Sequence, residues 1–241
     1  MTTLILTRHY LGETFHNRLG VVFGAVQPAL YLVLFGPLFD RSGVGSWNVL
    51  VPGLLVQLGL MSAGLAGFGI VFDQRFGVLD RLRVTPAGRL SLLLGRVLKD
   101  AVVLLIQAVL LLALGYAFGL RAPLLGVLLG LMLMTMLAIS LASLSYAAAL
   151  RIRQELFAPI TSTVVVPLLL LSGAFLPMSL APRWLDILSR FTPFRYVVEA
   201  VRGLFAGSYA SAPVLWGTVV SLVLAVASVA VGVRIFQSEN A

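Results

Sequence analysis

Long apolar runs separated by short polar segments form the main pattern of this chain. A helix that crosses a hydrocarbon core of about 30 Å needs roughly 20 mostly apolar residues. A segment in lipid must also satisfy its own backbone hydrogen bonds, and these runs are too long for the strands of a membrane barrel. The pattern predicts an all-α polytopic membrane protein in which residues 1–241 form a single transmembrane domain. The six predicted spans are 20–39, 49–72, 99–120, 124–150, 156–177 and 213–236.

The segment before the first span, 1–19, mixes apolar and charged residues. Leu4, Leu11 and Phe15 recur near helical spacing, while Arg8 and other polar residues lie between them. This mixture is typical of an amphipathic helix that lies along the membrane surface. We therefore expect an interfacial helix here, with a plain solvated tail as the alternative.

Composition supports the membrane interpretation. Hydrophobic residues make up 60% of the chain and charged residues 11%, whereas a soluble domain carries about 25% charged residues to wet its surface. The net charge of +8 could suggest nucleic acid, but there is one lysine and the arginines are scattered between apolar runs. We expect membrane lipid and no nucleic acid among the partners. The absence of cysteine excludes disulfides and thiolate metal sites.

Lysine and arginine are unevenly distributed among the connections, and cytoplasmic loops of membrane proteins are enriched in both. Most of them lie in the N-terminal segment, the 73–99 connection, the 151–155 turn and the C-terminal tail. The two short loops on the other side hold only Arg41 and Arg121. Both termini are therefore predicted to face the cytoplasm. The connection 178–207 is an exception, because it places four arginines on the predicted external side.

Motifs for chemistry are missing. The sequence has no GxxxxGK[ST] phosphate loop, no nucleophile elbow and no cluster of metal-ligating residues. The apolar cores of the first, second, fourth, fifth and sixth spans contain no ionisable residue. Arg96, Lys99 and Asp100 lie at the predicted cytoplasmic end of the third span, where Arg96 and Asp100 are one turn apart and could pair. This weighs against an ion-coupled carrier, which needs a titratable site near the middle of the membrane. We expect a chain that is not an enzyme and binds no metal.

The cytoplasmic connection contains a short amphipathic segment, 73–84. Phe76, Leu79 and Leu82 recur near helical spacing among acidic and basic residues, and Thr85 followed by Pro86 is typical of a helix start. Two interpretations remain open: an interfacial helix on the lipid surface, or a docking surface for a partner. The acidic residues slightly favour docking, since a lipid anchor has no use for them.

The external connection 178–207 carries two helix starts, at Pro182 and at Thr192 with Pro193. The resulting pieces are too short to span and are largely apolar, which favours a re-entrant or interfacial helical hairpin over an ordinary loop. Charges at one-turn spacing predict three ion pairs that would compensate the exceptional arginines. These pairs are Asp186 with Arg190, Arg195 with Glu199, and Glu199 with Arg202.

In these two connections the sequence resembles the permease subunits of ABC-2 type transporters, particularly the drug-resistance group that includes daunorubicin exporters. The resemblance lies in RFGVLDRLRVTP at 75–86, which continues into LLGRV at 93–97, and in LSGAFLP at 171–177, followed by Trp184 and by TPFRY at 192–196. The number and order of spans also agree. Family members often carry glutamate where this chain has Asp73 and Asp80.

The resemblance implies a coupling helix at 73–84 that docks on a cytoplasmic ATP-binding subunit, present in two copies. It also implies a second permease chain, identical or different, and an external re-entrant hairpin that gates release. The coupling residues would be Asp73, Arg75, Phe76, Gly77, Leu79, Asp80, Arg81, Arg83, Thr85 and Pro86. The hairpin residues would be Phe175, Pro177, Trp184, Pro193, Arg195, Tyr196, Glu199 and Arg202.

The function implied is export of a hydrophobic or amphiphilic, drug-like molecule across a bacterial plasma (inner) membrane. The chain itself would hold no cofactor, because ATP and magnesium would bind to the partner ATPase. Two alternatives remain: export of a lipid-linked polysaccharide or lipo-oligosaccharide by the same machinery, and an ATP-independent carrier or membrane scaffold.

Overall fold

The computed structural model describes residues 7, 10–12, 14, 18–42, 47–75, 89–175 and 177–238, and their regular secondary structure is entirely helical. This confirms the predicted all-α class. The long helices are α2 (Arg18–Ser42), α3 (Trp47–Gly64), α6 (Arg89–Phe118), α7 (Leu124–Arg151), α8 (Gln154–Leu171) and α11 (Ala212–Ser238). The short elements are α4 (Phe68–Arg75), the 3₁₀ turn η1 (Met178–Leu180), α9 (Arg183–Arg190) and α10 (Pro193–Phe205).

Five stretches of described helix are long and apolar enough to cross a membrane, and each coincides with a predicted span. They are Trp47–Phe72, Ser91–Phe118, Leu124–Arg151, Gln154–Leu171 and Ala212–Ile235. The first predicted span, 20–39, lies within α2, where the described apolar stretch is Gly24–Leu38. The chain thus has the helices of a multi-pass membrane protein.

Several predicted boundaries differ from the structure. The second span was expected to run unbroken over 49–72, but α3 ends at Gly64 and a turn at 65–67 precedes α4. Hydrophobicity alone gives no sign of this break, because the run stays apolar across it. The α4 backbone remains helical through Arg75, so it extends past the end of the predicted span into the first residues of 73–84. Likewise α6 begins at Arg89 rather than at 99, and α8 ends at Leu171 rather than at 177.

Two predicted segments cannot be compared with the structure. Residues 76–88, which hold most of the coupling segment and its residues Phe76 to Pro86, lie outside the described residues. Most of the predicted interfacial helix at 1–19 also lies outside them.

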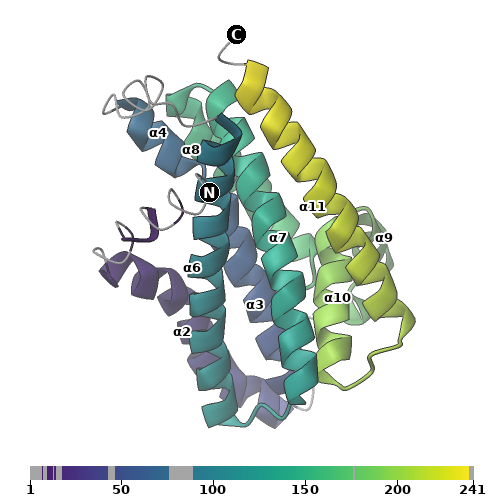
Figure 1. The fold of residues 1–241 in the computed structure, drawn as a ribbon. Helices are drawn as coiled ribbons and strands as arrows, with labels where there is room; N and C mark the ends of the chain where they lie inside the picture. Colours follow the sequence, from purple (N-terminus) through teal and green to yellow (C-terminus); the bar gives the residue numbers. More distant parts are fainter. Residues whose placement is uncertain are drawn as a thin grey trace.

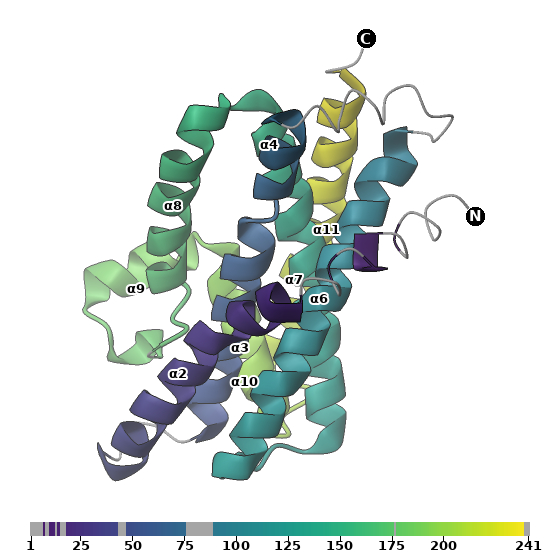
Figure 2. The same cartoon turned by 90° about the vertical axis from the view of Figure 1, so that its left-hand side faces the viewer.

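Helix α3 lies at the centre of the bundle, where it contacts α2, α6, α7, α8 and α10 (Figures 1 and 2). Every residue from Leu50 to Leu60 is buried. The helices α7 and α10 approach closely because α7 carries glycine at their contact. A Cβ added to Gly126 would lie 2.1 Å from the carbonyl oxygen of Leu204, so only glycine allows this approach.

The ends of the helices fall into two groups. The end of α4, the start of α6, the turn between α7 and α8 and the end of α11 lie at one end of the bundle (Figures 1 and 2). The loop between α6 and α7 lies at the opposite end. This arrangement matches the alternation of sides predicted from the loop charges.

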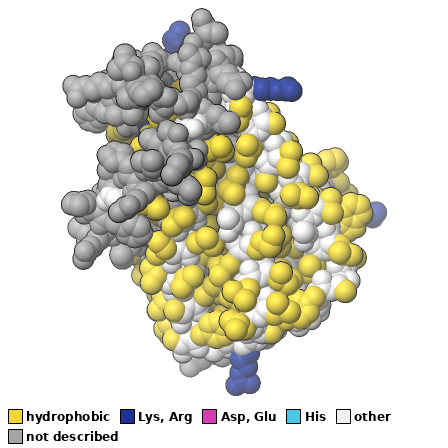
Figure 3. All heavy atoms as spheres, viewed as in Figure 1, with side chains coloured by type: hydrophobic (Ala, Val, Ile, Leu, Met, Phe, Trp, Pro, Cys, Tyr) yellow, Lys and Arg dark blue, Asp and Glu magenta, His cyan; other side chains and the backbone are white. Residues whose placement is uncertain are grey.

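The outer surface is apolar over its middle. The face in Figure 3 carries hydrophobic side chains over most of its height, and the Lys and Arg side chains in view project at its margins. Few residues of α8 or of the stretch Ala212–Ile235 are buried inside the bundle. An apolar surface of this extent is poorly hydrated in water, so lipid is the solvent that suits α8 and α11.

Candidate functional site

The connection 178–207 forms the two predicted short helices. Helix α9 has 8 residues with Pro182 as its N-cap, and α10 has 13 residues with Thr192 as its N-cap and Pro193 in its first turn. The Thr192 hydroxyl does not cap α10. It donates to the Ser189 carbonyl at 2.7 Å and so closes the corner between the helices. Neither helix is long enough to cross a membrane.

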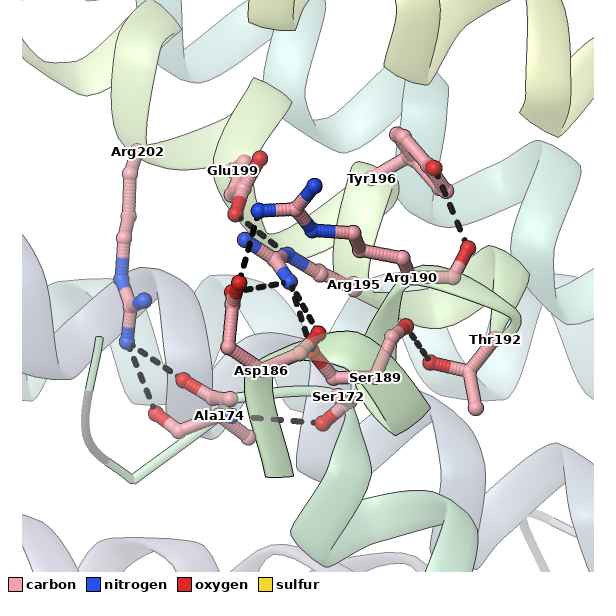
Figure 4. Close-up of polar contacts among 11 residues, drawn as sticks. Ser172, Ala174, Asp186, Ser189, Arg190, Thr192, Arg195, Tyr196, Glu199 and Arg202 are labelled. Atoms are coloured by element: carbon pink, nitrogen blue, oxygen red, sulfur yellow. Dashed lines mark hydrogen bonds and ion pairs between the residues drawn. The ribbon is translucent and has the colours of Figure 1, made fainter. Parts of the chain in front are cut away.

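Arg195 joins these two helices (Figure 4). Its Nη1 atom lies 2.6 Å from Asp186 Oδ1 and donates to Ser189 Oγ at 2.6 Å, while its Nε donates to Glu199 Oε1 at 2.8 Å. Arg190 Nη2 binds the second oxygen of Asp186 at 2.7 Å. Two predicted pairs, Asp186 with Arg190 and Arg195 with Glu199, are thereby confirmed. The bridge from Arg195 to Asp186 was missed, because it links two helices and has no one-turn spacing.

The charges of this cluster, made of Asp186, Arg190, Arg195 and Glu199, support one another. Hydrogen bonds from Arg195 and Arg190 lower the pKa of the Asp186 carboxyl below its ordinary value. Burial works against the charge of Arg195, but its hydrogen bonds to Glu199 and Asp186 prevail and raise the pKa of this guanidinium. Asp186 and Arg195 therefore stay ionised near neutral pH, and the ion pair between them fixes the angle between α9 and α10.

Arg202 takes different partners from the predicted one. Among the described residues its guanidinium makes no ion pair with Glu199. Its Nε instead donates to the Val49 carbonyl at 3.1 Å, and its Nη2 donates to the carbonyls of Gly173 at 2.8 Å and Ala174 at 3.2 Å (Figure 4). The helix α8 ends inside the bundle and leaves carbonyls without helical partners, and an arginine has enough donors to serve them.

Burial of Arg202 lowers its pKa to about 10, and the nearby charge of Glu199 opposes this shift. The guanidinium therefore remains protonated at neutral pH. Arg202 thus holds three parts of the chain together: the first turn of α3, the end of α8, and α10.

The end of α8 is fixed by further contacts. The Ser172 hydroxyl donates to the Leu169 carbonyl at 2.6 Å and accepts from the Ala174 N–H at 3.2 Å. A Cβ added to Gly53 of α3 would lie 1.7 Å from the Ala174 carbonyl oxygen, so the two backbones are in direct contact. The ring of Phe175 packs edge-on against Tyr31 of α2, with ring centroids 5.7 Å apart.

The structure brings together some of the predicted hairpin residues and separates others. Arg195, Glu199 and the Tyr196 hydroxyl, which donates to the Arg190 carbonyl at 3.1 Å, belong to one network. The Trp184 side chain is 63% exposed. Pro177 precedes η1 as its N-cap.

The polar residues near the start of α6 also differ from expectation. Arg96 does not pair with Asp100, and its guanidinium carbon lies 5.2 Å from the centre of the Tyr10 ring. Asp100 instead pairs with Lys99 at 2.6 Å and accepts a short hydrogen bond from the Tyr146 hydroxyl. Tyr146 lies on α7, and no spacing rule in the sequence connects it to Asp100.

Comparison with known proteins identifies the class. The profile of the ABC-2 type transporter family matches residues 2–206, so the chain belongs to this family of transport permeases. Permeases of this family are membrane subunits that are not themselves catalytic, and they normally work with an ATP-binding subunit.

Two individual members of the similar proteins are transport permeases. The chain is 30% identical over 199 residues to ycf38 of Cyanophora paradoxa, described as a transport permease, covering 78% of this chain and 68% of the relative. It is 24% identical over 246 residues to DrrC of Mycobacterium tuberculosis, described as a doxorubicin resistance ABC transporter permease. That alignment covers 96% of this chain and 88% of DrrC.

Proposed function

We propose that this chain is the membrane-spanning subunit of an ATP-driven exporter that moves a hydrophobic or amphiphilic, drug-like molecule out across a bacterial plasma membrane. The observation that carries the proposal is the similarity to DrrC over 96% of the chain, within a family match to transport permeases. The name of that relative links it to resistance against doxorubicin, an amphiphilic drug.

The ATP would be hydrolysed by a partner. The chain has one lysine and no phosphate loop, so ATP and magnesium would bind to a separate cytoplasmic ATPase, in two copies beside two permease chains. The segment 73–84 would contact that ATPase. It begins in the last turn of α4, whose end lies at the same end of the bundle as the start of α6. A short helix between two spans can transmit ATPase closure to both.

The hairpin of α9 and α10 would form an external re-entrant gate. Its helices are too short to span. Helix α10 packs against α11 (Figure 1), and α9 contacts α8 and α10. The cluster around Arg195 would keep the hairpin rigid, and Arg202 would fix it to α3 and α8, so that it moves as a unit.

The experiment uses inverted membrane vesicles that contain the chain together with its ATPase, with doxorubicin as the probe. Charge reversal in the coupling segment, by Asp80→Arg or Arg81→Glu, should lower ATP-dependent doxorubicin accumulation at least about tenfold, a typical magnitude for loss of coupling between sites. Membrane insertion of the chain should be unchanged. Arg121→Glu is the matched control, because Arg121 lies in the opposite loop and contacts Asn48 only through its backbone.

Other outcomes would change the assignment. Normal transport in both coupling variants would remove the coupling role from 73–84. ATP-dependent release of a lipid-linked saccharide without doxorubicin transport would favour the polysaccharide exporter. Uptake driven by a proton gradient in vesicles without an ATPase would refute the ATP-driven mechanism.

A further inference from the structure

The break between α3 and α4 frees two backbone groups inside the bundle. In an uninterrupted helix the Gly67 N–H would donate to the Ala63 carbonyl, and the Phe68 N–H would donate to the Gly64 carbonyl. Here Ala66 N–H donates to Ala63 at 3.2 Å, and Phe68 N–H donates to Leu65 at 3.1 Å. The Gly67 N–H and the Gly64 carbonyl are therefore left without helical partners.

One side chain of α7 serves both freed groups. The Ser145 hydroxyl donates to the Gly64 carbonyl at 2.6 Å and accepts from the Gly67 N–H at 2.8 Å, and both bonds are buried. The contact is close, since a Cβ added to Gly67 would lie 2.4 Å from the Ser145 carbonyl oxygen. Because unsatisfied backbone groups are costly in a membrane, these two bonds tie the break firmly to α7.

Tyr146, the next residue of α7, binds α6, the helix that follows the cytoplasmic connection. The Tyr146 hydroxyl donates to Asp100 of α6, and the second carboxylate oxygen of Asp100 pairs with Lys99 at 2.6 Å. The Tyr146 side chain is 1% exposed. The helix α4 leads into the connection 76–88, and α6 leads out of it. Ser145 therefore binds the backbone just before α4, and the adjacent Tyr146 binds α6.

We propose that Ser145 and Tyr146 are positioning residues for energy coupling, which make α4, α7 and α6 move together when the coupling segment moves. This inference rests on the proposed function. Without the Ser145 bonds α4 would pivot at the break, and motion of the coupling segment would be absorbed there instead of reaching α7.

The first test measures whether Ser145 holds α4 in place and needs no partner protein. The chain has no cysteine, so spin labels can be attached at Gly69→Cys and Val231→Cys without further changes. A side chain at Gly69 would meet no atom within 4 Å, and Val231 on α11 is 43% exposed. Ser145→Ala should broaden the distance distribution between the labels. Ser140→Ala should not, because the buried Ser140 hydroxyl bonds only within α7, to Met136 at 2.7 Å. Ser145→Thr retains the hydroxyl and should restore the narrow distribution.

The second test measures doxorubicin transported per ATP hydrolysed by the complete transporter. Ser145→Ala should lower this ratio by roughly two- to thirty-fold while ATP hydrolysis continues, as expected for a residue that carries coupling. Tyr146→Phe should act in the same direction and provides the test if Ser145→Ala does not fold. Its control is Tyr116→Phe, because the Tyr116 hydroxyl makes an exposed hydrogen bond to the Ala122 carbonyl.

An unchanged distance distribution in Ser145→Ala, or a broadened one with normal transport per ATP, would overturn the inference. If the wild-type complex hydrolyses ATP but exports nothing, the proposed function fails and the coupling role fails with it. The spin-label result would still decide whether Ser145 anchors the break.

Discussion

At the scale of the residue, Arg202 shows how a buried charge can serve the backbone instead of a carboxylate. Its three hydrogen bonds reach the carbonyl of Val49 in the first turn of α3 and those of Gly173 and Ala174 in the turn after α8. Charged donors form stronger hydrogen bonds than neutral ones, and a planar guanidinium can direct several at once. Arg202 thus stabilises the end of α8 inside the bundle together with the contacts of Ser172, Gly53 and Phe175.

We expect Arg202→Gln to destabilise the protein by about 3 kcal/mol, because hydrogen bonds from a charged donor contribute about 1.5–3 kcal/mol each and an amide cannot replace all of them. The measurement is thermal unfolding of the purified chain in detergent. Arg190→Gln is the matched control. The Arg190 side chain is 64% exposed, so loss of its ion pair should cost less than about 1 kcal/mol. Equal losses in the two variants would contradict the anchoring role of Arg202.

At the scale of the element, glycines decide where helices in this bundle touch. Gly53 of α3 lies against the backbone that follows α8, whereas Gly69 of α4 faces open space. The two residues belong to the same apolar run, and nothing in the local sequence distinguishes their roles. The central position of α3 therefore depends on the absence of a side chain at one of them.

Gly53→Ala should destabilise the protein by about 1–3 kcal/mol, the usual cost of forcing an extra methyl into a packed site. The new Cβ would lie 1.7 Å from the Ala174 carbonyl oxygen, so α3 or the end of α8 must move. Gly69→Ala should be neutral, or stabilising by up to about 1 kcal/mol, since alanine favours helix more than glycine does. Thermal unfolding in detergent compares the two directly, and a tolerated Gly53→Ala would refute the close contact.

At the scale of the whole molecule, the apolar surface and the two groups of helix ends define how the bundle sits in a membrane. The basic residues of the connections predict which end faces the cytoplasm. The hairpin, with its four arginines, is compatible with the external side because Arg195 and Arg190 are paired and Arg202 is bound to backbone.

Single cysteines should reveal this orientation. Ser208→Cys, in the exposed loop between α10 and α11, should react with a membrane-impermeant maleimide in intact cells. Arg153→Cys, in the turn between α7 and α8, should react only after the cells are permeabilised. Because the chain has no cysteine of its own, the background is low. The reverse pattern of labelling would invert the predicted topology.

The sequence by itself determined the solvent, the helical class and most of the spans, because apolar length and loop charge are properties of continuous segments. It also predicted the two short helices of the hairpin and two of its three expected ion pairs, Asp186 with Arg190 and Arg195 with Glu199. The family resemblance, carried by two short connections, was likewise present in the sequence and is confirmed by the match over residues 2–206.

Only the tertiary structure decided the contacts between distant segments. The break after Gly64 lies in an unbroken apolar run, and the hydroxyl that satisfies it comes from Ser145, on another helix. The partners of Arg202 are backbone carbonyls, which every residue possesses and which no residue pattern marks. Tyr146 and Asp100 meet because α6 and α7 pack side by side. The packing of helices places a donor beside an acceptor on another helix, and the spacing of residues along the sequence does not predict such a pair.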